Sequence, residues 1–164
     1  MVLREPTASD ADTLLSILAE PEVARWWPPF DRARVLAELI AERDDEEGFV
    51  IEHAGSVIGY IQCAEEPDPE FRHASIDLFL SASAQGKGLG PAAIRVLAVE
   101  LLDGRGHHRI TIDPVVDNTR AIAAYAKVGF RPVGRLRQYQ RMTDGTWADA
   151  LLMDLLAAEL VRSP

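Results

Sequence analysis

The chain has a single cysteine, Cys63, among its 164 residues, which excludes a disulfide bond within it and gives no sign of an oxidising compartment. No apolar run approaches the ~20 residues that a membrane-spanning helix needs, and no early segment has the pattern of a signal peptide. Basic residues are also few, 17 against 26 acidic ones, and this net charge of −9 argues against a nucleic-acid partner. We therefore expect a cytoplasmic protein without nucleic-acid or membrane partners.

The charges that are present are distributed unevenly along the chain. Hydrophobic residues make up 48% and charged residues 26%, as in an ordinary globular protein, and the length predicts one domain over residues 1–164. The net charge is −12 over residues 1–84, +6 over 85–141 and −3 over 142–164. A basic block inside an acidic chain suggests one anionic and one cationic ligand, although a solvated acidic surface is the simpler alternative.

The spacing of apolar residues predicts an α/β fold of the α+β type. The element order is β-α-α-β-β-β-α-β-α-β-β. The expected strands cover residues 2–4, 49–52, 57–63, 75–80, 109–113, 130–141 and 147–156. The expected helices follow Thr7 and Asp31, cover residues 91–102, and run from the cap Asn118 to about residue 128. Pro21 ends or bends the first of them.

A glycine-rich turn lies where the strand at residues 75–80 gives way to the helix that begins near Pro91. Glycines let backbone N–H groups approach one anion, and a helix N-terminus adds a favourable dipole. The turn therefore predicts pyrophosphate binding, with a purely structural turn as the alternative. Its spacing matches neither a Walker loop nor the dinucleotide pattern G-x-G-x-x-G. The turn reads Gln85, Gly86, Lys87, Gly88, Leu89 and Gly90.

A second motif follows about thirty residues downstream, on the next predicted helix. It contains Asn118, Ala121, Tyr125, Lys127 and the pair Gly129-Phe130. A Gln-x-x-Gly-x-Gly turn followed at this distance by such a helix resembles the GNAT superfamily of acyl-CoA-dependent N-acetyltransferases. The element order resembles the GNAT fold over nearly the whole chain, which implies a mixed central sheet of about seven strands.

The resemblance implies acetyl-CoA as the co-substrate, with no metal. Backbone groups of Leu78 and Leu80 would pair with the pantetheine arm, on a strand that diverges from its neighbour. The pyrophosphate would be held by backbone N–H groups of Gln85, Gly86, Lys87, Gly88, Leu89 and Gly90. Asn118 would fix the acyl-CoA chain near its bend, and Tyr125 would be the general acid for the departing thiolate. A neutral phenol is protonated at pH 7, which agrees with that role, but Tyr125 packing its ring alone is the alternative.

Two aspartates are the candidates for binding and deprotonating an amine. Asp77 lies on the strand before the glycine-rich turn and Asp113 ends the following strand, so one cleft could receive both carboxylates. A carboxylate binds an ammonium, and with a raised pKa it can act as a base directly or through water. The alternative is a strand-end cap or a salt bridge. His107 precedes a strand and is expected to be a surface or spacing residue, and Cys63 is expected to be buried rather than nucleophilic.

Local matches point to a subfamily. The segment 22–27, which contains Trp26 and Trp27, looks like the paired-tryptophan loop of aminoglycoside 6′-N-acetyltransferases, whose active-site acids map onto Asp77 and Asp113. The tryptophans would cover an apolar sugar face or an ammonium, or they form a hydrophobic staple between helices. Residues 65–70 lack the aromatic side chains of that subfamily's substrate loop, and residues 144–154 resemble a wider set of acetyltransferases.

The leading hypothesis is therefore direct acetyl transfer to the primary amine of a small cationic substrate, with an aminoglycoside 6′-amine first. One alternative is acetylation of a protein N-terminal amine or a siderophore hydroxylamine. Another is an acyl-CoA sensor that does not catalyse transfer. We expect a monomer or a homodimer, since late strands of this fold can pair across a dimer.

Overall fold

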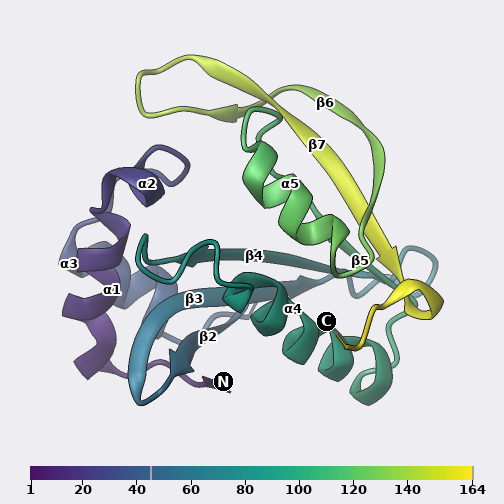
Figure 1. The fold of residues 1–164 in the computed structure, drawn as a ribbon, viewed down its shortest axis with the longest axis horizontal. Coiled ribbons are helices and arrows are strands. Elements are labelled where there is room, and N and C mark those ends of the chain that lie inside the picture. The colour runs from purple at the N-terminus through teal and green to yellow at the C-terminus, as the bar shows by residue number, and fades with distance from the viewer. Residues whose placement is uncertain (45, 164) are drawn as a thin grey trace.

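A computed structural model describes residues 1–44 and 46–163, which form a seven-stranded mixed sheet with helices on both faces (Figure 1). Across the sheet the strands follow the order β1-β2-β3-β4-β5-β7-β6. The strands are β1 (Val2–Arg4), β2 (Glu47–His53), β3 (Ser56–Glu65), β4 (Ala74–Leu80), β5 (Arg109–Ile112), β6 (Arg131–Arg141) and β7 (Trp147–Leu156). All of the expected strands are present, and the predicted α/β class is confirmed.

The helices differ from the expected set by one short addition. They are α1 (Ala11–Leu18), α2 (Pro21–Ala24), α3 (Arg32–Val35), α4 (Leu89–Val99) and α5 (Thr119–Ala126). Short turns η1 (Ala8–Asp10), η2 (Leu36–Ile40), η3 (Glu100–Gly104) and η4 (Ala157–Glu159) flank them. Pro21 does end α1, but it also opens α2, because proline suits the first turn of a helix. In the part of the chain described, no helix is both long and apolar enough to cross a membrane.

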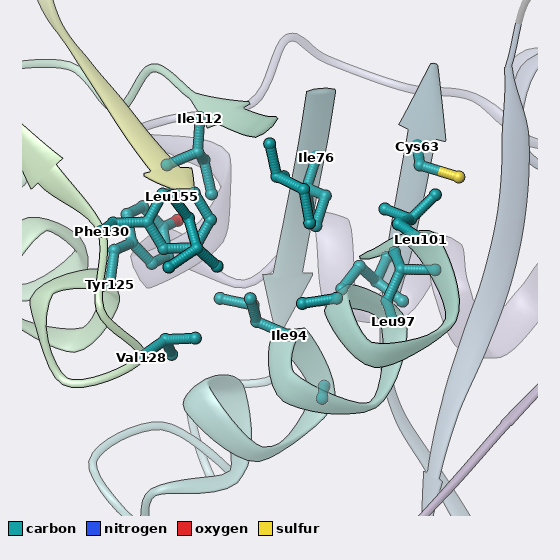
Figure 2. Packing of buried hydrophobic residues seen from close by; sticks show 14 of the residues in the cluster. Cys63, Ile76, Ile94, Leu97, Leu101, Ile112, Tyr125, Val128, Phe130 and Leu155 are labelled. Atoms are coloured by element: carbon teal, nitrogen blue, oxygen red, sulfur yellow. The ribbon is translucent and has the colours of Figure 1, made fainter. Parts of the chain in front are cut away.

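Alternating side chains of the central strands divide the core into two clusters. Val50, Tyr60 and Phe79 face one side of the sheet and pack with α1 and α3. Their neighbours along each strand belong to the larger cluster, which includes α4 and α5. Figure 2 shows Ile94 and Leu97 of α4 near Ile76 of β4 in this cluster. The period of two predicted from the sequence thus gives each face of the sheet its own helical layer.

The sheet opens between β4 and β5. These parallel strands pair only at Ala74–Ile110 and Ser75–Thr111. Beyond that point the chain after β5 stays with β7, since Leu151 N–H donates to the Pro114 carbonyl at 2.8 Å. The rest of β4 therefore keeps an edge that β5 does not pair, as the resemblance implied. This divergence makes room for a site in the middle of the sheet.

Candidate active site

A cleft of about 520 Å³ runs from the edge of β4 that β5 does not pair to the N-terminal end of α4 and along α5. We call it the donor cleft, because it is lined by residues expected to hold acetyl-CoA, the acetyl donor. Most of the residues expected to hold the co-substrate line it, namely Leu78, Leu80, Gln85, Gly86, Gly88, Gly90, Asn118 and Tyr125. Lys87 and Leu89 are described but are not in this lining, and Lys87 is exposed. Lys127 and Arg120 add positive charge to the lining at α5.

The glycine-rich turn leaves a row of backbone donors without protein acceptors. Gly86 and Gly88 have φ of +76° and +77°, a left-handed conformation that glycine adopts without steric cost. Among the hydrogen bonds of the described residues, none is donated by the backbone N–H groups of residues 86–90. The Gln85 side chain braces the turn, since its Nε2 donates to the Leu80 carbonyl at 2.9 Å. Free N–H groups beside a helix N-terminus favour an anion.

Asn118 stands at the start of α5 and borders the donor cleft. Its Oδ1 accepts a hydrogen bond from the Ala121 N–H at 3.2 Å, so the predicted helix cap is confirmed. Arg120, two residues further on, donates from Nη1 to Oε1 of Gln85 at 3.2 Å and connects α5 to the glycine-rich turn. A Cβ at Gly86 would lie 2.9 Å from Nη2 of Arg120, so the glycine also admits this close approach.

A smaller cleft of about 180 Å³ lies beside the donor cleft. We call it the acceptor cleft, because it contains the residues expected to bind the amine that accepts the acetyl group. It brings together both predicted acids, both tryptophans and the predicted tyrosine, and adds a glutamine that the sequence did not indicate. These residues are Trp26, Trp27, Asp77, Asp113, Tyr125 and Gln140. The expectation that one cleft receives the carboxylates of two neighbouring strands is therefore confirmed.

Each carboxylate of this cleft is held at one oxygen. Asp77 Oδ1 accepts the Leu78 N–H at 2.8 Å, and Asp113 Oδ2 accepts the Tyr139 hydroxyl at 2.9 Å. Asp77 is an exposed residue that borders the cleft, and the protein atoms of the cleft walls reduce the water around its carboxylate. This loss of hydration raises the pKa of Asp77 to about 7, and the nearby negative charges of Asp113 and Glu46 add to the effect. Asp77 can therefore exchange a proton near neutral pH.

Tyr125 stands where the two clefts meet. Its ring is 9% exposed and packs with Phe130 at 6.2 Å between centroids (Figure 2), so it fills core space as well as lining both clefts. No residue in the described ranges bonds to its hydroxyl. Burial, and then the charges of Asp77 and Asp113, raise the pKa of Tyr125 well above its ordinary value. The hydroxyl is therefore a neutral hydrogen-bond donor with no partner yet.

The two tryptophans have different surroundings. Trp27 lies edge-on to Phe79, with ring centroids 5.0 Å apart, and packs with the core cluster beneath α1 and α3. The Arg25 guanidinium lies over the Trp26 ring, 4.4 Å from its centroid. Trp26 also accepts a hydrogen bond at its carbonyl from Gln140 Nε2, at 2.7 Å. Trp27 thus packs between the helices and the sheet, whereas the staple alternative expected a contact between two helices, and both tryptophans line the clefts.

Comparison with known proteins decides the family. Residues 1–131 match the family described as the acetyltransferase (GNAT) domain. The chain belongs to this family. It is 29% identical to an aminoglycoside N(6′)-acetyltransferase type 1 of Klebsiella pneumoniae over 153 residues, which is 82% of this chain and 75% of that protein. It is 30% identical to the N-alpha-acetyltransferase RimI of Mycobacterium tuberculosis over 128 residues, 77% of this chain and 73% of the relative.

A solved structure gives the same picture for the fold. The crystal structure of aminoglycoside acetyltransferase AAC(6′)-Ib in complex with coenzyme A and kanamycin superposes with a TM-score of 0.76 at 28% identity. The match covers 96% of this chain and 95% of that chain. The chain is an acetyltransferase with the GNAT fold, as the resemblance implied.

The expected surface position of His107 was wrong. His107 is 2% exposed rather than at the surface, and its Nε2 lies 2.6 Å from Glu65 Oε2. Glu65 also accepts from Arg105, so the start of the acidic segment 65–70 is held by side chains of this protein. No residue of that segment lines either cleft. Cys63 is buried as expected, and burial raises its thiol pKa to about 11, so it is not an activated nucleophile.

Three residues of the site had not been recognised from the sequence. Arg120 lines the donor cleft, Gln140 lines the acceptor cleft, and Tyr139 bonds to Asp113. Arg120 lies two residues after Asn118 in the second motif, and the shared helix was a signal that could have found it. Tyr139 and Gln140 gave no such signal, because their approach depends on an irregularity of β6.

Proposed function

We propose that this acetyltransferase transfers the acetyl group of acetyl-CoA to a primary amine of a small polycationic acceptor, with an aminoglycoside 6′-amine as the leading candidate. The observation that carries the proposal is the wall shared by the donor and acceptor clefts. The residues common to both linings are Trp26, Trp27, Leu78, Asn118 and Tyr125. A thioester in one cleft and an amine in the other would meet at Tyr125.

The donor cleft supplies the groups that acetyl-CoA needs. On the edge of β4 that β5 does not pair, Leu78 and Leu80 offer backbone groups to the amides of the pantetheine arm. Two of these groups, the Leu78 N–H and the Leu80 carbonyl, also bond to the side chains of Asp77 and Gln85. The free N–H groups of residues 86–90 receive the pyrophosphate, with Arg120 and Lys127 nearby. Asn118, at the start of α5, borders the path between them. Lys87, exposed on the turn, adds a charge that attracts the anion.

The acceptor cleft supplies the proton transfers. Asp77, ionised above a pKa of about 7, takes a proton from the attacking ammonium or amine, directly or through water. Acetyl-CoA supplies an acetyl thioester, whose C–S bond breaks as the new C–N bond forms. Tyr125 donates a hydrogen bond to the departing thiolate. Because its pKa is raised far above the ~8.5 of a thiol, Tyr125 stabilises the thiolate mainly by this hydrogen bond, and solvent completes its protonation.

The choice of acceptor rests on two kinds of support. Two carboxylates beside two tryptophans suit a molecule with several ammonium groups and an apolar face. The relative of Klebsiella pneumoniae acts on aminoglycosides by its name, and the similar crystal structure holds kanamycin. A protein N-terminal amine is the second candidate, supported by the similarity to RimI.

Thiol release from acetyl-CoA in the presence of kanamycin or tobramycin tests the proposal. We expect turnover with these amines and less with an alanyl peptide or a hydroxylamine. Tyr125→Phe should lower kcat by about 10²-fold, because it deletes the donor to the thiolate. Turnover with the peptide and not with the aminoglycosides would make a protein N-terminal amine the acceptor. Binding of acetyl-CoA in calorimetry without transfer to any amine would contradict the proposal that the protein is a catalyst.

A further inference from the structure

Strand β6 contains an irregular segment opposite Asp149 of β7. Leu136 pairs with Ala150 and Gln140 with Ala148, so residues 137–139 together oppose Asp149 alone. A bulge of this kind bends a strand and redirects its side chains. It lies in the hairpin of β6 and β7, which rises beside α5 in Figure 1.

Asp149 holds the bulge closed. Its Oδ1 accepts the Gln138 N–H at 2.7 Å, and its Oδ2 accepts Nε of Arg135 at 2.5 Å. Gln138 has a φ of +48°, a left-handed conformation that is sterically unfavourable for a residue with a side chain. A strained residue persists where its surroundings fix it, and the carboxylate of Asp149 is the group that does so here.

The bulge directs two consecutive side chains to the acceptor cleft. Consecutive residues of a regular strand point to opposite faces, but Tyr139 and Gln140 both reach walls of this cleft. The Tyr139 hydroxyl donates to Oδ2 of Asp113 at 2.9 Å, and Gln140 Nε2 donates to the Trp26 carbonyl at 2.7 Å. The β6 hairpin is thus fastened to both the acid and the tryptophan loop.

We propose that Tyr139 is a positioning residue for the acceptor: it holds Oδ2 of Asp113 so that Oδ1 is presented to an ammonium group. The inference rests on the proposed function, since it concerns the same cleft. No described residue bonds to Oδ1 of Asp113 or to Oδ2 of Asp77, whose Oδ1 is held by the Leu78 N–H. Each acid therefore has one fixed and one open oxygen.

This arrangement selects a class of acceptor. Asp77 serves the amine that reacts, and Asp113 binds a second ammonium of the same molecule. A diamine or polyamine uses both open oxygens, whereas a monoamine leaves the Asp113 carboxylate in the cleft without a counter-charge. Tyr139 is then a determinant of specificity for acceptors with at least two amino groups. It acts through Asp113, which it holds by a hydrogen bond and which binds the acceptor.

Steady-state kinetics of Tyr139→Phe test this role. Removing one hydrogen bond to a charged group weakens binding by about tenfold, so we expect KM for kanamycin to rise about tenfold. The value of kcat should stay within about twofold, and KM for acetyl-CoA should not change. Asp149→Ala, which releases the bulge, should raise KM for kanamycin in the same way while keeping the hydroxyl. An unchanged KM for kanamycin in Tyr139→Phe would overturn the proposal.

Trp147→Phe is the matched control. Trp147 is 58% exposed on the same hairpin and lines neither cleft, so this variant should keep the KM of the wild type. If Trp147→Phe raised KM as much as Tyr139→Phe, a general effect of the hairpin would replace the specific one. Kinetics with a kanamycin-sized monoamine provide the second contrast, because Tyr139→Phe should change its KM little.

An optical titration of the tyrosines separates this inference from the proposed function, because it needs no substrate. Burial, and then the hydrogen bond to Asp113, raise the pKa of Tyr139, which is the most exposed of the three tyrosines. Asp113→Asn should bring that pKa back toward ~10. An unaltered titration would show that the contact is absent and would refute the inference. Wild-type protein inactive on kanamycin would refute only the acceptor, and the Tyr139→Phe kinetics would then use whichever diamine or peptide is turned over.

Discussion

At the scale of single residues, the site depends on two aspartates whose surroundings differ. Asp77 lies on β4 with one backbone N–H as its partner, and Asp113 follows β5 with a phenol as its partner. When two carboxylates share one site, different environments around them can make one a base and the other a binding group. The raised pKa identifies Asp77 as the proton acceptor in our proposal. In the same proposal Asp113, held by Tyr139, is the binding group.

The pH dependence of the rate tests this assignment. A base works in its ionised form, so kcat/KM of the wild type should rise as pH increases through about 7 and then level off. Asp77→Asn should lose that rise and lower kcat by ~10²-fold or more. Asp113→Asn should keep the rise and increase KM for the acceptor. The assignment is reversed if Asp113→Asn abolishes the rise and Asp77→Asn keeps it.

At the scale of elements, the passage from α5 to β6 fixes Tyr125 in place. The chain turns at Gly129, which has a φ of +118° and follows α5 as the sequence predicted. A Cβ here would lie 2.2 Å from the backbone oxygen of Glu159, in the turn η4 that packs on this corner. The tyrosine and the strand that carries Tyr139 are therefore joined by a corner that only glycine fits.

Gly129→Ala should accordingly destabilise the protein by more than about 3 kcal/mol, because both the backbone conformation and a backbone atom oppose the new methyl group. Gly145→Ala is the matched control. Gly145 also has a positive φ, +85°, but no atom lies within 4 Å of its ideal Cβ. We expect this control to lose only about 1 kcal/mol. Chemical denaturation measures both, and equal losses would contradict the role assigned to Glu159.

Much of the element pattern could be predicted, because it depends on local periodicity. The hairpin of β2 and β3, the cap Asn118 and the meeting of Asp77 with Asp113 all follow from spacing along the chain and the pairing of adjacent elements. The burial of His107 could not be predicted, since its partner Glu65 is 42 residues away. The bulge of β6 was also hidden, because Asp149 fixes it from the opposite strand.

At the scale of the whole molecule, the uneven charge has a more specific meaning than its sum. The basic block includes the glycine-rich turn and α5, which border the donor cleft. The acidic block supplies Asp77, but other acids of that block, including Glu47 and Glu65, pair with Arg105 away from the clefts. The acidity of the acceptor cleft therefore comes from two carboxylates rather than from the block as a whole.

One of those carboxylates reduces the stability of the fold. The pKa of Asp77 is raised from 3.8 to about 7 in the native state. Between pH ~4 and ~7 the unfolded chain therefore carries this carboxylate ionised while the native state keeps it protonated. The contribution of Asp77 to the free energy of unfolding is greatest below pH ~4 and is lost as pH rises through about 7. Asp77→Asn should therefore raise Tm at pH 8 while lowering activity, and should change Tm little at pH 4.

Asp12→Asn is the control for that measurement. Asp12 is an exposed carboxylate paired with Arg32, and such surface pairs contribute little to stability. Its substitution should leave Tm nearly constant at both pH values. A drop in Tm for Asp77→Asn at pH 8 would mean that the ionised carboxylate stabilises the fold and would contradict the direction of the shift.

The shared wall of the two clefts has a consequence for the order in which the substrates arrive. Leu78, Asn118 and Tyr125 each present a surface to both clefts, so a molecule seated in the donor cleft completes one side of the acceptor cleft. In the proposed function, the amine would therefore meet a complete pocket only after acetyl-CoA has bound. We expect a compulsory sequence of addition, with the acetylated amine leaving before the free thiol.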